Sequence, residues 1–291
     1  MKKSWLTLIF LFNLIPYSGF CQLSEIIQNI ECKGLIKDQE SKNPLPYASI
    51  GLLNTPYGTL SDSLGRYNFQ VEKFNPGDSI QISLLGYVIK RIDCLEFFKT
   101  SIKEIFLNKK IQMLAEVRVS DKEMKTEIIG RQSSSMLTQV SLHKKGAANE
   151  TVGSEFGIKI KSEHSSAILK NFNWFISNNN FKSIKFRINV YSVKNDLPDT
   201  LVCRNQITIT LKHFQTGWSR INLEEYGIHI NGEVIVTLQW LEGITENNKN
   251  PTTIIPVAIT PFSSNCYSRT ASQDKWTKFD IKPSCYATII Y

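Results

Sequence analysis

The stretch YGTLSDSLGRYNFQV, residues 57 to 71, decides how the first part of the chain folds. Its second half, YNFQV, alternates apolar and polar side chains, as a strand with one buried face does. Asp62 and Ser63 suit the early positions of a turn, and Gly65 adopts a positive φ without penalty. The stretch is therefore predicted to be a β-hairpin. A calcium loop is the alternative, but Asp62 has no acidic partner at the spacing that such a loop requires.

On both sides of this hairpin, short apolar runs alternate with turn residues from Glu31 to Asn108. This pattern is typical of an all-β sandwich. The strands that we expect are Cys32 to Lys37, Tyr47 to Leu53, Gly58 to Leu60, Tyr67 to Val71, Ser79 to Leu84, Tyr87 to Ile92 and Ile102 to Leu107.

The same segment closely resembles the carboxypeptidase-like regulatory domain, a family that is abundant in exported proteins of Bacteroidetes. The resemblance covers residues 31–108, and its pieces occur in the expected order. They are Gly34 to Asp38, Pro44 to Ile50, Gly58-Thr59, Ser61-Asp62, Gly65 to Phe69, Gly77 to Ile80, Ser83 and Gly86-Tyr87.

This resemblance implies a transthyretin-like β-sandwich that carries no peptidase chemistry. In related proteins the module often precedes a TonB-dependent outer-membrane transporter or another exported domain. The run LAEVRVSD, Leu114 to Asp121, looks like the segment that follows the module in such proteins. The rest of the chain is too short for the plug and the large barrel of a transporter.

The N-terminus has the layout of a secretory signal peptide. Lys2 and Lys3 precede an apolar run, and small residues follow at Gly19 and Cys21. We expect residues 1–21 to be removed by cleavage before Gln22, which places the protein in the periplasm, at the outer membrane or on the cell surface. The alternative is a lipoprotein signal in which Cys21 is lipidated, although the preceding position then favours a small residue rather than phenylalanine.

The charge of the chain is only mildly basic. The 291 residues carry a net charge of +8, which falls to +6 when Lys2 and Lys3 leave with the signal. Basic residues are mixed with acidic ones, as in the run DKEMK at 121–125, whereas a nucleic-acid interface needs a concentrated basic face. We expect no nucleic-acid partner.

The rest of the chain is predicted to be a linker, residues 109–145, and a second domain, residues 146–291. The linker has few aromatic residues, and we interpret it as a strand-like start followed by a linker or an edge segment. In the second domain, apolar residues alternate over Ile184 to Tyr191 and Val234 to Trp240, which predicts a jelly-roll-like β-sandwich. Asn171 to Asn180 and Thr245 to Thr253 are expected to be polar insertions. A looser resemblance links this half to the partner domain of similar two-domain proteins.

Five cysteines remain after the signal, and an exported chain can form disulfides. The simplest pairing within domains joins Cys32 to Cys94 and Cys266 to Cys285, and it leaves Cys203 over. The alternative is that the cysteines are buried, unpaired and act as small apolar residues.

No catalytic motif is recognisable in the sequence. The chain has four histidines, His143, His164, His213 and His229, and none of them begins the His-x-x-Glu pair of a zinc carboxypeptidase. A serine-nucleophile elbow, a phosphate loop and a dinucleotide fingerprint are also lacking. We therefore expect a protein that is not an enzyme and that needs no metal or cofactor.

The remaining indication of function comes from the tryptophans of the second domain. Trp240 shares a strand face with aliphatic residues and is predicted to lie in the core, whereas Trp218 and Trp276 lie near turns. Our first hypothesis is an exported, non-catalytic binding or scaffolding protein, accessory to an outer-membrane or surface assembly and bound to an envelope protein. The alternative is carbohydrate binding through Trp218 or Trp276, with a surface glycan as the partner and peripheral association with the outer membrane.

Overall fold

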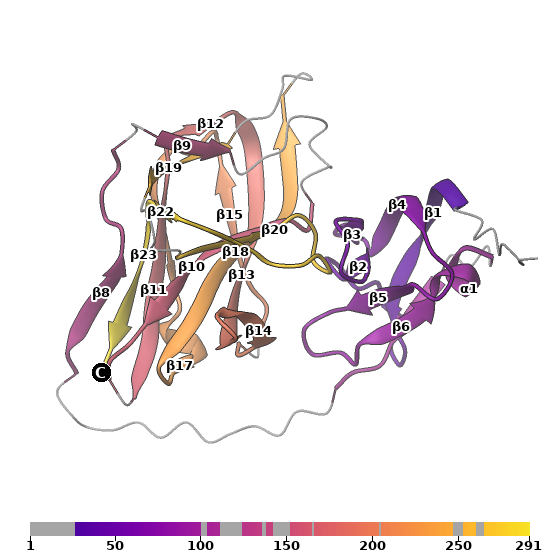
Figure 1. Cartoon of the computed structure of the whole chain (residues 1–291), viewed down its shortest axis with the longest axis horizontal. Coiled ribbons are helices and arrows are strands. Elements are labelled where there is room, and N and C mark those ends of the chain that lie inside the picture. The colour runs from indigo at the N-terminus through magenta and orange to yellow at the C-terminus, as the bar shows by residue number, and fades with distance from the viewer. Residues whose placement is uncertain are drawn as a thin grey trace, which may run out of the picture.

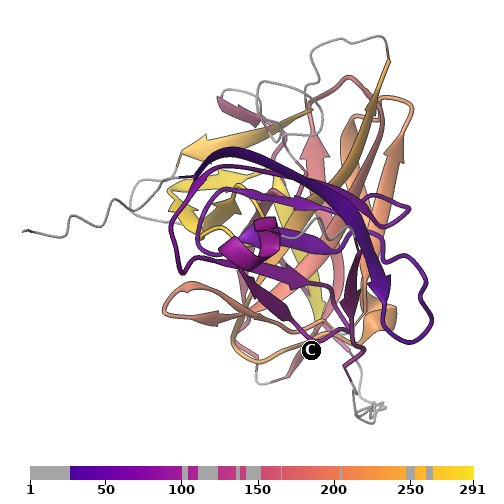
Figure 2. The ribbon, with the colours of Figure 1, turned by 90° about the vertical axis from the view of Figure 1, so that its right-hand side faces the viewer.

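The computed structural model describes residues 27–99, 104–110, 124–135, 138–141, 152–164, 166–203, 205–246, 253–259 and 265–291. The predicted signal peptide lies outside these residues. The chain is all-β and contains two hydrophobic cores, one in residues 27–110 and one further along the chain. Figure 1 shows the first unit, in indigo to magenta, beside the larger second unit, and in Figure 2 the first lies in front of the second.

The first unit is a sandwich of two small sheets. One sheet has the order β4-β1-β7 and the other has the order β3-β2-β5-β6. The strands are β1 (Ile27–Asp38), β2 (Ser49–Leu52), β3 (Gly58–Leu60), β4 (Arg66–Phe74), β5 (Ser79–Ser83), β6 (Lys90–Asp93) and β7 (Glu104–Leu107), and the helix α1 spans Cys94–Lys99.

The alternation in β4 shows why this segment forms a strand. Tyr67, Phe69 and Val71 are buried in the core, and the residues between them are exposed. The aromatic side chains of α1 close the end of this core, because Phe97 packs edge-on against Phe69 with ring centroids 6.1 Å apart. All seven predicted strands are confirmed, while the short helix was not predicted.

The second unit is a sandwich of larger sheets. A seven-stranded sheet has the order β14-β13-β18-β10-β20-β21, with β15 also paired to β13. A five-stranded sheet has the order β16-β11-β23-β8, with β17 also paired to β11, and a third sheet joins β9, β12, β19 and β22. All pairs in these sheets are antiparallel, and strands distant in the sequence lie side by side.

The strands of this unit vary widely in length. They are β8 (Thr126–Gly130), β9 (Thr138–Ser141), β10 (Glu155–Lys161), β11 (Ala167–Ile176), β12 (Asn178–Asn179), β13 (Phe181–Lys194), β14 (Leu197–Leu201), β15 (Ile207–Lys212), β16 (Gly217–Asn222), β17 (His229–Ile230), β18 (Glu233–Thr245), β19 (Thr253–Ile259), β20 (Cys266–Arg269), β21 (Thr277–Phe279), β22 (Ile281–Pro283) and β23 (Cys285–Ile290), and a 3-10 helix spans Glu224–Tyr226.

The core of the second unit lies between these sheets. Trp240, predicted to be a core residue, is 2% exposed and packs edge-on against Phe181 and Phe186. The described part of the chain contains no helix with the length and apolar character needed to span a membrane.

Two predicted boundaries look different in the structure. The proposed linker contains β8 and β9, which pair with β23 and β19 and so extend sheets of the second sandwich. The stretch 171–180, predicted to be a polar insertion, lies instead mostly in β11, because its asparagines alternate with buried Phe172, Trp174 and Ile176.

Candidate functional site

The turn predicted at Asp62 to Gly65 is confirmed, but the predicted β-hairpin is wrong, because β3 pairs with β2 and β4 pairs with β1, so the turn connects the two sheets of the first unit. The Asp62 carboxylate accepts hydrogen bonds from the backbone N–H groups of Leu64 (2.8 Å) and Arg66 (2.9 Å), so its oxygen Oδ1 stabilises the turn itself. Gly65 has a φ of 74°, and a Cβ atom there would come within 2.9 Å of the Ile36 carbonyl oxygen. The described residues contain no group of three acidic, histidine or cysteine side chains that could hold a metal ion.

Tyr47, which precedes β2, joins the two units. Its hydroxyl donates a hydrogen bond to the Glu242 carboxylate (3.1 Å) and accepts one from Lys185 Nζ (3.0 Å). The same ammonium lies 4.9 Å from the centroid of the tyrosine ring, which is a cation–π contact. Tyr47 has a φ of 55°, a conformation that is unusual for an aromatic residue and that needs support from its surroundings.

The ring of Tyr47 also belongs to a small apolar cluster between the units. Leu60 of the first unit and Leu241 of the second are buried with it, and Val152 packs against them. Apolar burial and polar contacts therefore meet at one residue of the first unit.

A second connection is made by the loop between β20 and β21, which reaches β2 (Figure 1). Gln273 donates from Nε2 to the hydroxyls of Ser49 and Ser83, both at 3.1 Å. Its Oε1 accepts from Gln81 Nε2 (2.7 Å), and its backbone carbonyl accepts from the Asn54 N–H (2.9 Å). One side chain thus satisfies its polar groups across the junction.

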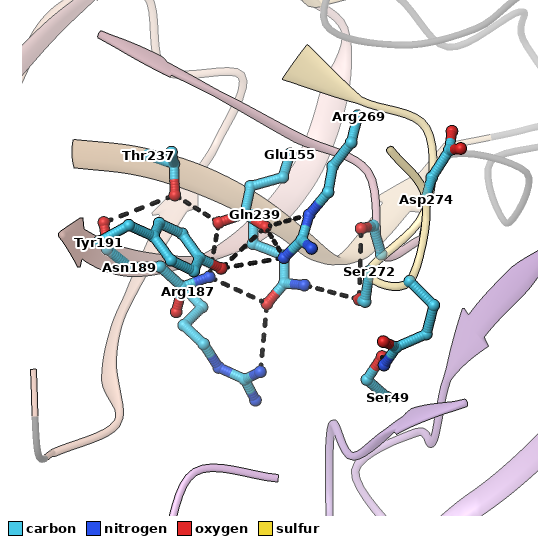
Figure 3. A network of polar contacts seen from close by, with 12 residues as sticks. Ser49, Glu155, Arg187, Asn189, Tyr191, Thr237, Gln239, Arg269, Ser272 and Asp274 are labelled. Atoms are coloured by element: carbon cyan, nitrogen blue, oxygen red, sulfur yellow. Dashed lines mark hydrogen bonds and ion pairs between the residues drawn. The ribbon is translucent and has the colours of Figure 1, made fainter. Parts of the chain in front are cut away.

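Behind this junction lies a buried polar network centred on Glu155 of β10 (Figure 3). Glu155 is 2% exposed, and its Oε2 accepts from Arg269 Nε (2.9 Å) and Nη2 (2.5 Å). Oε1 accepts from Asn189 Nδ2 (2.7 Å) and from the Thr237 hydroxyl, and the Tyr191 hydroxyl donates to Oε2 (3.3 Å). Four side chains therefore donate hydrogen bonds to this one buried carboxylate.

Arg187 of β13 connects that network to the first unit. Its Nη2 donates to the Tyr47 carbonyl oxygen (2.9 Å), and its Nη1 donates to Gln239 Oε1 (3.1 Å), which also accepts from Asn189. Arg187 is 6% exposed, and burial lowers the pKa of its guanidinium. By contrast, Arg269 is also buried, but the adjacent Glu155 carboxylate raises its pKa.

Trp276, one of the two predicted ligand-binding tryptophans, covers this network. Its ring centroid lies 4.4 Å from Cζ of Arg269, and its ring lies 5.5 Å from that of Tyr191 at 73°. The side chain is only half-exposed. Its ring is therefore engaged with the guanidinium and the tyrosine of the protein itself.

Trp218, the other predicted ligand-binding residue, lies on a different face. It is 38% exposed on β16 and makes edge-on contacts with Phe175 (5.4 Å) and Tyr286 (5.1 Å). We call Trp218, Phe175 and Tyr286 the aromatic cluster. Beside it, Arg220 lies opposite Asn173, whose amide donates to Asn171 (2.6 Å).

The structure does not bring the two tryptophans together. Trp218 belongs to the five-stranded sheet, whereas Trp276 packs on the outer face of the seven-stranded sheet. The prediction also missed the Glu155 network. One signal in the sequence could have indicated that this face is buried. Strand β18 has no charged residue between Val234 and Leu241 on either face, and such a pattern indicates a strand that is buried on both faces.

Residues 32–119 match the family model of the CarboxypepD_reg-like domain. This segment is a CarboxypepD_reg-like domain. The match includes the turn at Asp62 to Gly65, Tyr47, most of β1 and all of the other strands of the first unit, and it extends beyond the predicted end at residue 108.

Solved structures give only distant similarities. The cysteine protease and lectin-like domains of Cwp84, a surface layer associated protein of Clostridium difficile, align with a TM-score of 0.39 and 9% identity over 84% of this chain and 58% of that chain. Clostridial Cwp84 after propeptide cleavage aligns with a TM-score of 0.39 and 10% identity over 83% and 64%. The structure of the infectious bursal disease virus Gx strain aligns with a TM-score of 0.24 and 9% identity, over 91% of this chain and 63% of that chain. The chain thus spans less than two thirds of each of these chains, and no curated protein matches its sequence.

The predicted disulfides are not formed. Cys32, Cys94, Cys203, Cys266 and Cys285 are all buried, and none of these five is disulfide-bonded to another. In the CarboxypepD_reg-like domain, Cys32 Sγ lies 3.8 Å from the Tyr67 hydroxyl, and Cys94 begins α1. Burial raises the pKa of Cys94 and of Cys266 to about 12, so these groups stay protonated and act as small apolar residues.

The described histidines have ordinary structural environments. His164 stacks on Tyr291 with ring centroids 3.3 Å apart, and its Nε2 lies 3.1 Å from the Glu127 carboxylate. His213 and His229 are exposed, and His143 lies outside the described residues.

A pH-dependent contribution to stability is expected at the turn between β13 and β14. The Asp196 carboxylate is bonded to Lys159 and Lys278, and these hydrogen bonds lower its pKa from 3.8 to about 2. The contribution is complete above the unfolded value of 3.8 and is lost as the pH falls through about 2. Asp196→Asn should therefore lower the free energy of unfolding at neutral pH by at most about 1 kcal/mol, because the group is half-exposed, and the difference should vanish between pH 4 and 2.

Urea denaturation across this pH range measures the difference. Asp199→Asn, at an exposed position of the neighbouring strand, is the matched control and should run parallel to the wild type. A deficit in Asp196→Asn that persists unchanged at pH 2 would contradict the assignment.

Proposed function

We propose that this chain is an exported, non-catalytic binding or scaffolding protein of the bacterial cell envelope, accessory to an outer-membrane or surface assembly. The junction between its two units supports this proposal best. Tyr47, Gln273 and Arg187 use their polar groups to hold the CarboxypepD_reg-like domain against the second sandwich. Of the charged side chains that the described residues bury, Glu155 contacts Arg269, Arg187 contacts neutral partners of the same network, and Asp38 of the first unit accepts from the Tyr87 hydroxyl and from two backbone N–H groups. We infer that these side chains stabilise the fold and the junction between the two units.

The test is a crosslinking pull-down of the tagged full-length protein from its native envelope, quantified against an untagged control. An envelope protein captured in stoichiometric amount supports the accessory role. Enrichment of no envelope protein would refute it.

A second candidate function, carbohydrate binding, is favoured by the aromatic cluster. An exposed tryptophan offers an apolar face to a pyranose ring, and the adjacent, exposed Arg220 offers hydrogen-bond donors to sugar hydroxyls. Trp276 is withdrawn from this candidate, since its ring is engaged by Arg269.

Trp218→Ala is expected to weaken binding of a polysaccharide at least about tenfold, because the substitution removes the aromatic ring on which the sugar would stack. Affinity electrophoresis in gels containing xylan, mannan or laminarin measures the change. The matched control is Phe279→Ala, an exposed aromatic residue (42%) on β21 of the opposite sheet. Equal retardation of both variants and the wild type would exclude the cluster as a glycan site.

A further inference from the structure

We infer that the outer edge of β4, over Asn68 to Glu72, is a docking site at which an extended segment of a partner protein adds as a strand. The inference rests on the proposed binding function and names the site and the class of partner. Its evidence is the phase of the backbone ladder, the lack of protection on this edge, and the cleft beside it.

The ladder between β1 and β4 fixes which backbone groups point outward. The Ile36 N–H donates to the Gly65 carbonyl (2.8 Å), and the antiparallel register continues from this pair without a shift. Hydrogen-bonded pairs then recur at every second residue, at Tyr67, Phe69 and Val71. The N–H and C=O groups of Asn68, Gln70 and Glu72 therefore face away from β1. Since β4 is the last strand of its sheet, no neighbouring strand of the described chain receives them.

Asp62 covers the beginning of this edge and no more. Its N–H donates to the Arg66 carbonyl (2.7 Å), and its Oδ1 accepts the Arg66 N–H (2.9 Å). The turn thus satisfies the outward groups of Arg66, and the row of unpaired backbone groups starts two residues later.

Two other edge strands carry features that discourage pairing, whereas in β4 the charged residues Arg66, Glu72 and Lys73 lie only towards its two ends. The edge strand β6 contains Lys90, Arg91 and Asp93, and the edge strand β14 contains Pro198. From Tyr67 to Val71, β4 has no charged residue, no proline and no bulge. An unprotected edge of this kind is a template for strand addition.

A cleft of about 1110 Å³ lies between the two units, lined by Arg66 to Asn68 and Gln70 of β4 and also by residues of β1 and β7 in the same sheet. Its apolar wall is the Tyr47 cluster with Leu60, Leu241 and Val152, and its rim includes Lys33, Arg66 and Glu242. A strand paired with β4 alternates its side chains between two faces. The segment that fits has an apolar residue at every second position, facing this wall, and small or polar residues between, with little net charge because the rim carries both signs.

The decisive variant is Gln70→Pro. Residue 70 belongs to a pair that is not hydrogen-bonded to β1, so proline removes an outward N–H without removing a ladder bond. Gln70→Ala is the matched control, because it changes the same side chain and keeps the donor.

The probe is a phage-displayed library of random twelve-residue peptides, selected on the full-length protein. Selected peptides should show the apolar–polar alternation and bind wild type and Gln70→Ala alike, but bind Gln70→Pro about tenfold or more weakly. Hydrogen exchange at Asn68, Gln70 and Glu72 should be fast in the free wild type and slow with peptide, a measurement that does not depend on the variant.

Several results would overturn the inference. The first two concern the peptides: Gln70→Pro binds them as tightly as the wild type, or the wild type selects no peptide. The third is protection of the three amides in the free protein. The fourth is a concentration-dependent dimer that Gln70→Pro abolishes, which would assign the edge to a second copy of this chain. The envelope pull-down separates this inference from the proposed function. A partner still captured by Gln70→Pro leaves the binding function standing and refutes strand addition, whereas the absence of any captured partner refutes the function itself.

Discussion

Glu155→Gln is expected to lower the free energy of unfolding by about 3–5 kcal/mol, because it leaves buried guanidinium groups without their counter-charge. The carboxylate accepts from Arg269, Asn189, Tyr191 and Thr237, and an amide would direct its own N–H groups at some of these donors. Chemical denaturation of the full chain measures the loss.

Glu163→Gln is the control for this experiment. Glu163 pairs with Lys161 at 2.9 Å, but its side chain is 79% exposed, so the substitution should leave the free energy of unfolding almost unchanged. Comparable effects of the two substitutions would show that the Glu155 network contributes little to stability.

Tyr47→Ala is expected to separate the unfolding of the two units. The variant loses the buried ring and the hydrogen bonds of its hydroxyl, and a truncation of this size in a buried site costs about 3 kcal/mol or more. Thermal unfolding should then show two transitions in place of one, since each unit keeps its own hydrophobic core.

Two further substitutions divide the effect of Tyr47 into its parts. Tyr47→Phe keeps the ring and removes the contacts to Glu242 and Lys185, at a cost of about 1–2 kcal/mol. Tyr47→Gly should be no less stable than Tyr47→Ala, because glycine adopts a φ of 55° freely. If Tyr47→Ala instead unfolds in a single transition at the wild-type midpoint, contacts other than those of Tyr47 couple the unfolding of the two units.

The fold of the CarboxypepD_reg-like domain could be predicted because its signals are local. Alternation in YNFQV and the turn residues before it define β3, the turn and β4 within fifteen residues. The six-residue helix α1 lacks the length at which helical periodicity becomes recognisable, and its apolar Phe97 and Phe98 read equally well as part of a strand.

The junction could not be predicted, because periodicity does not say what covers a strand. Arg187 and Asn189 alternate with core residues and so resemble a solvated face, yet both are buried by neighbouring segments. The exposure predicted for Trp276 failed for the same reason. Proximity to a turn does not reveal that Arg269 and Tyr191 pack against its ring. The two predicted disulfides were chosen as the simplest pairing within domains, and that criterion contains no geometry.

The pairing of β23 with both β11 and β8 sets an order for the formation of the protein. Every strand of the CarboxypepD_reg-like domain lies between residues 27 and 107, so this unit is complete early in synthesis. The second sandwich lacks an interior strand until Ile290 has emerged, and until then β8 and β11 have no partner at this position. A chain arrested before that point would present the unpaired strand β8 and one open edge of β11 to the surrounding medium, although the first unit would already be complete.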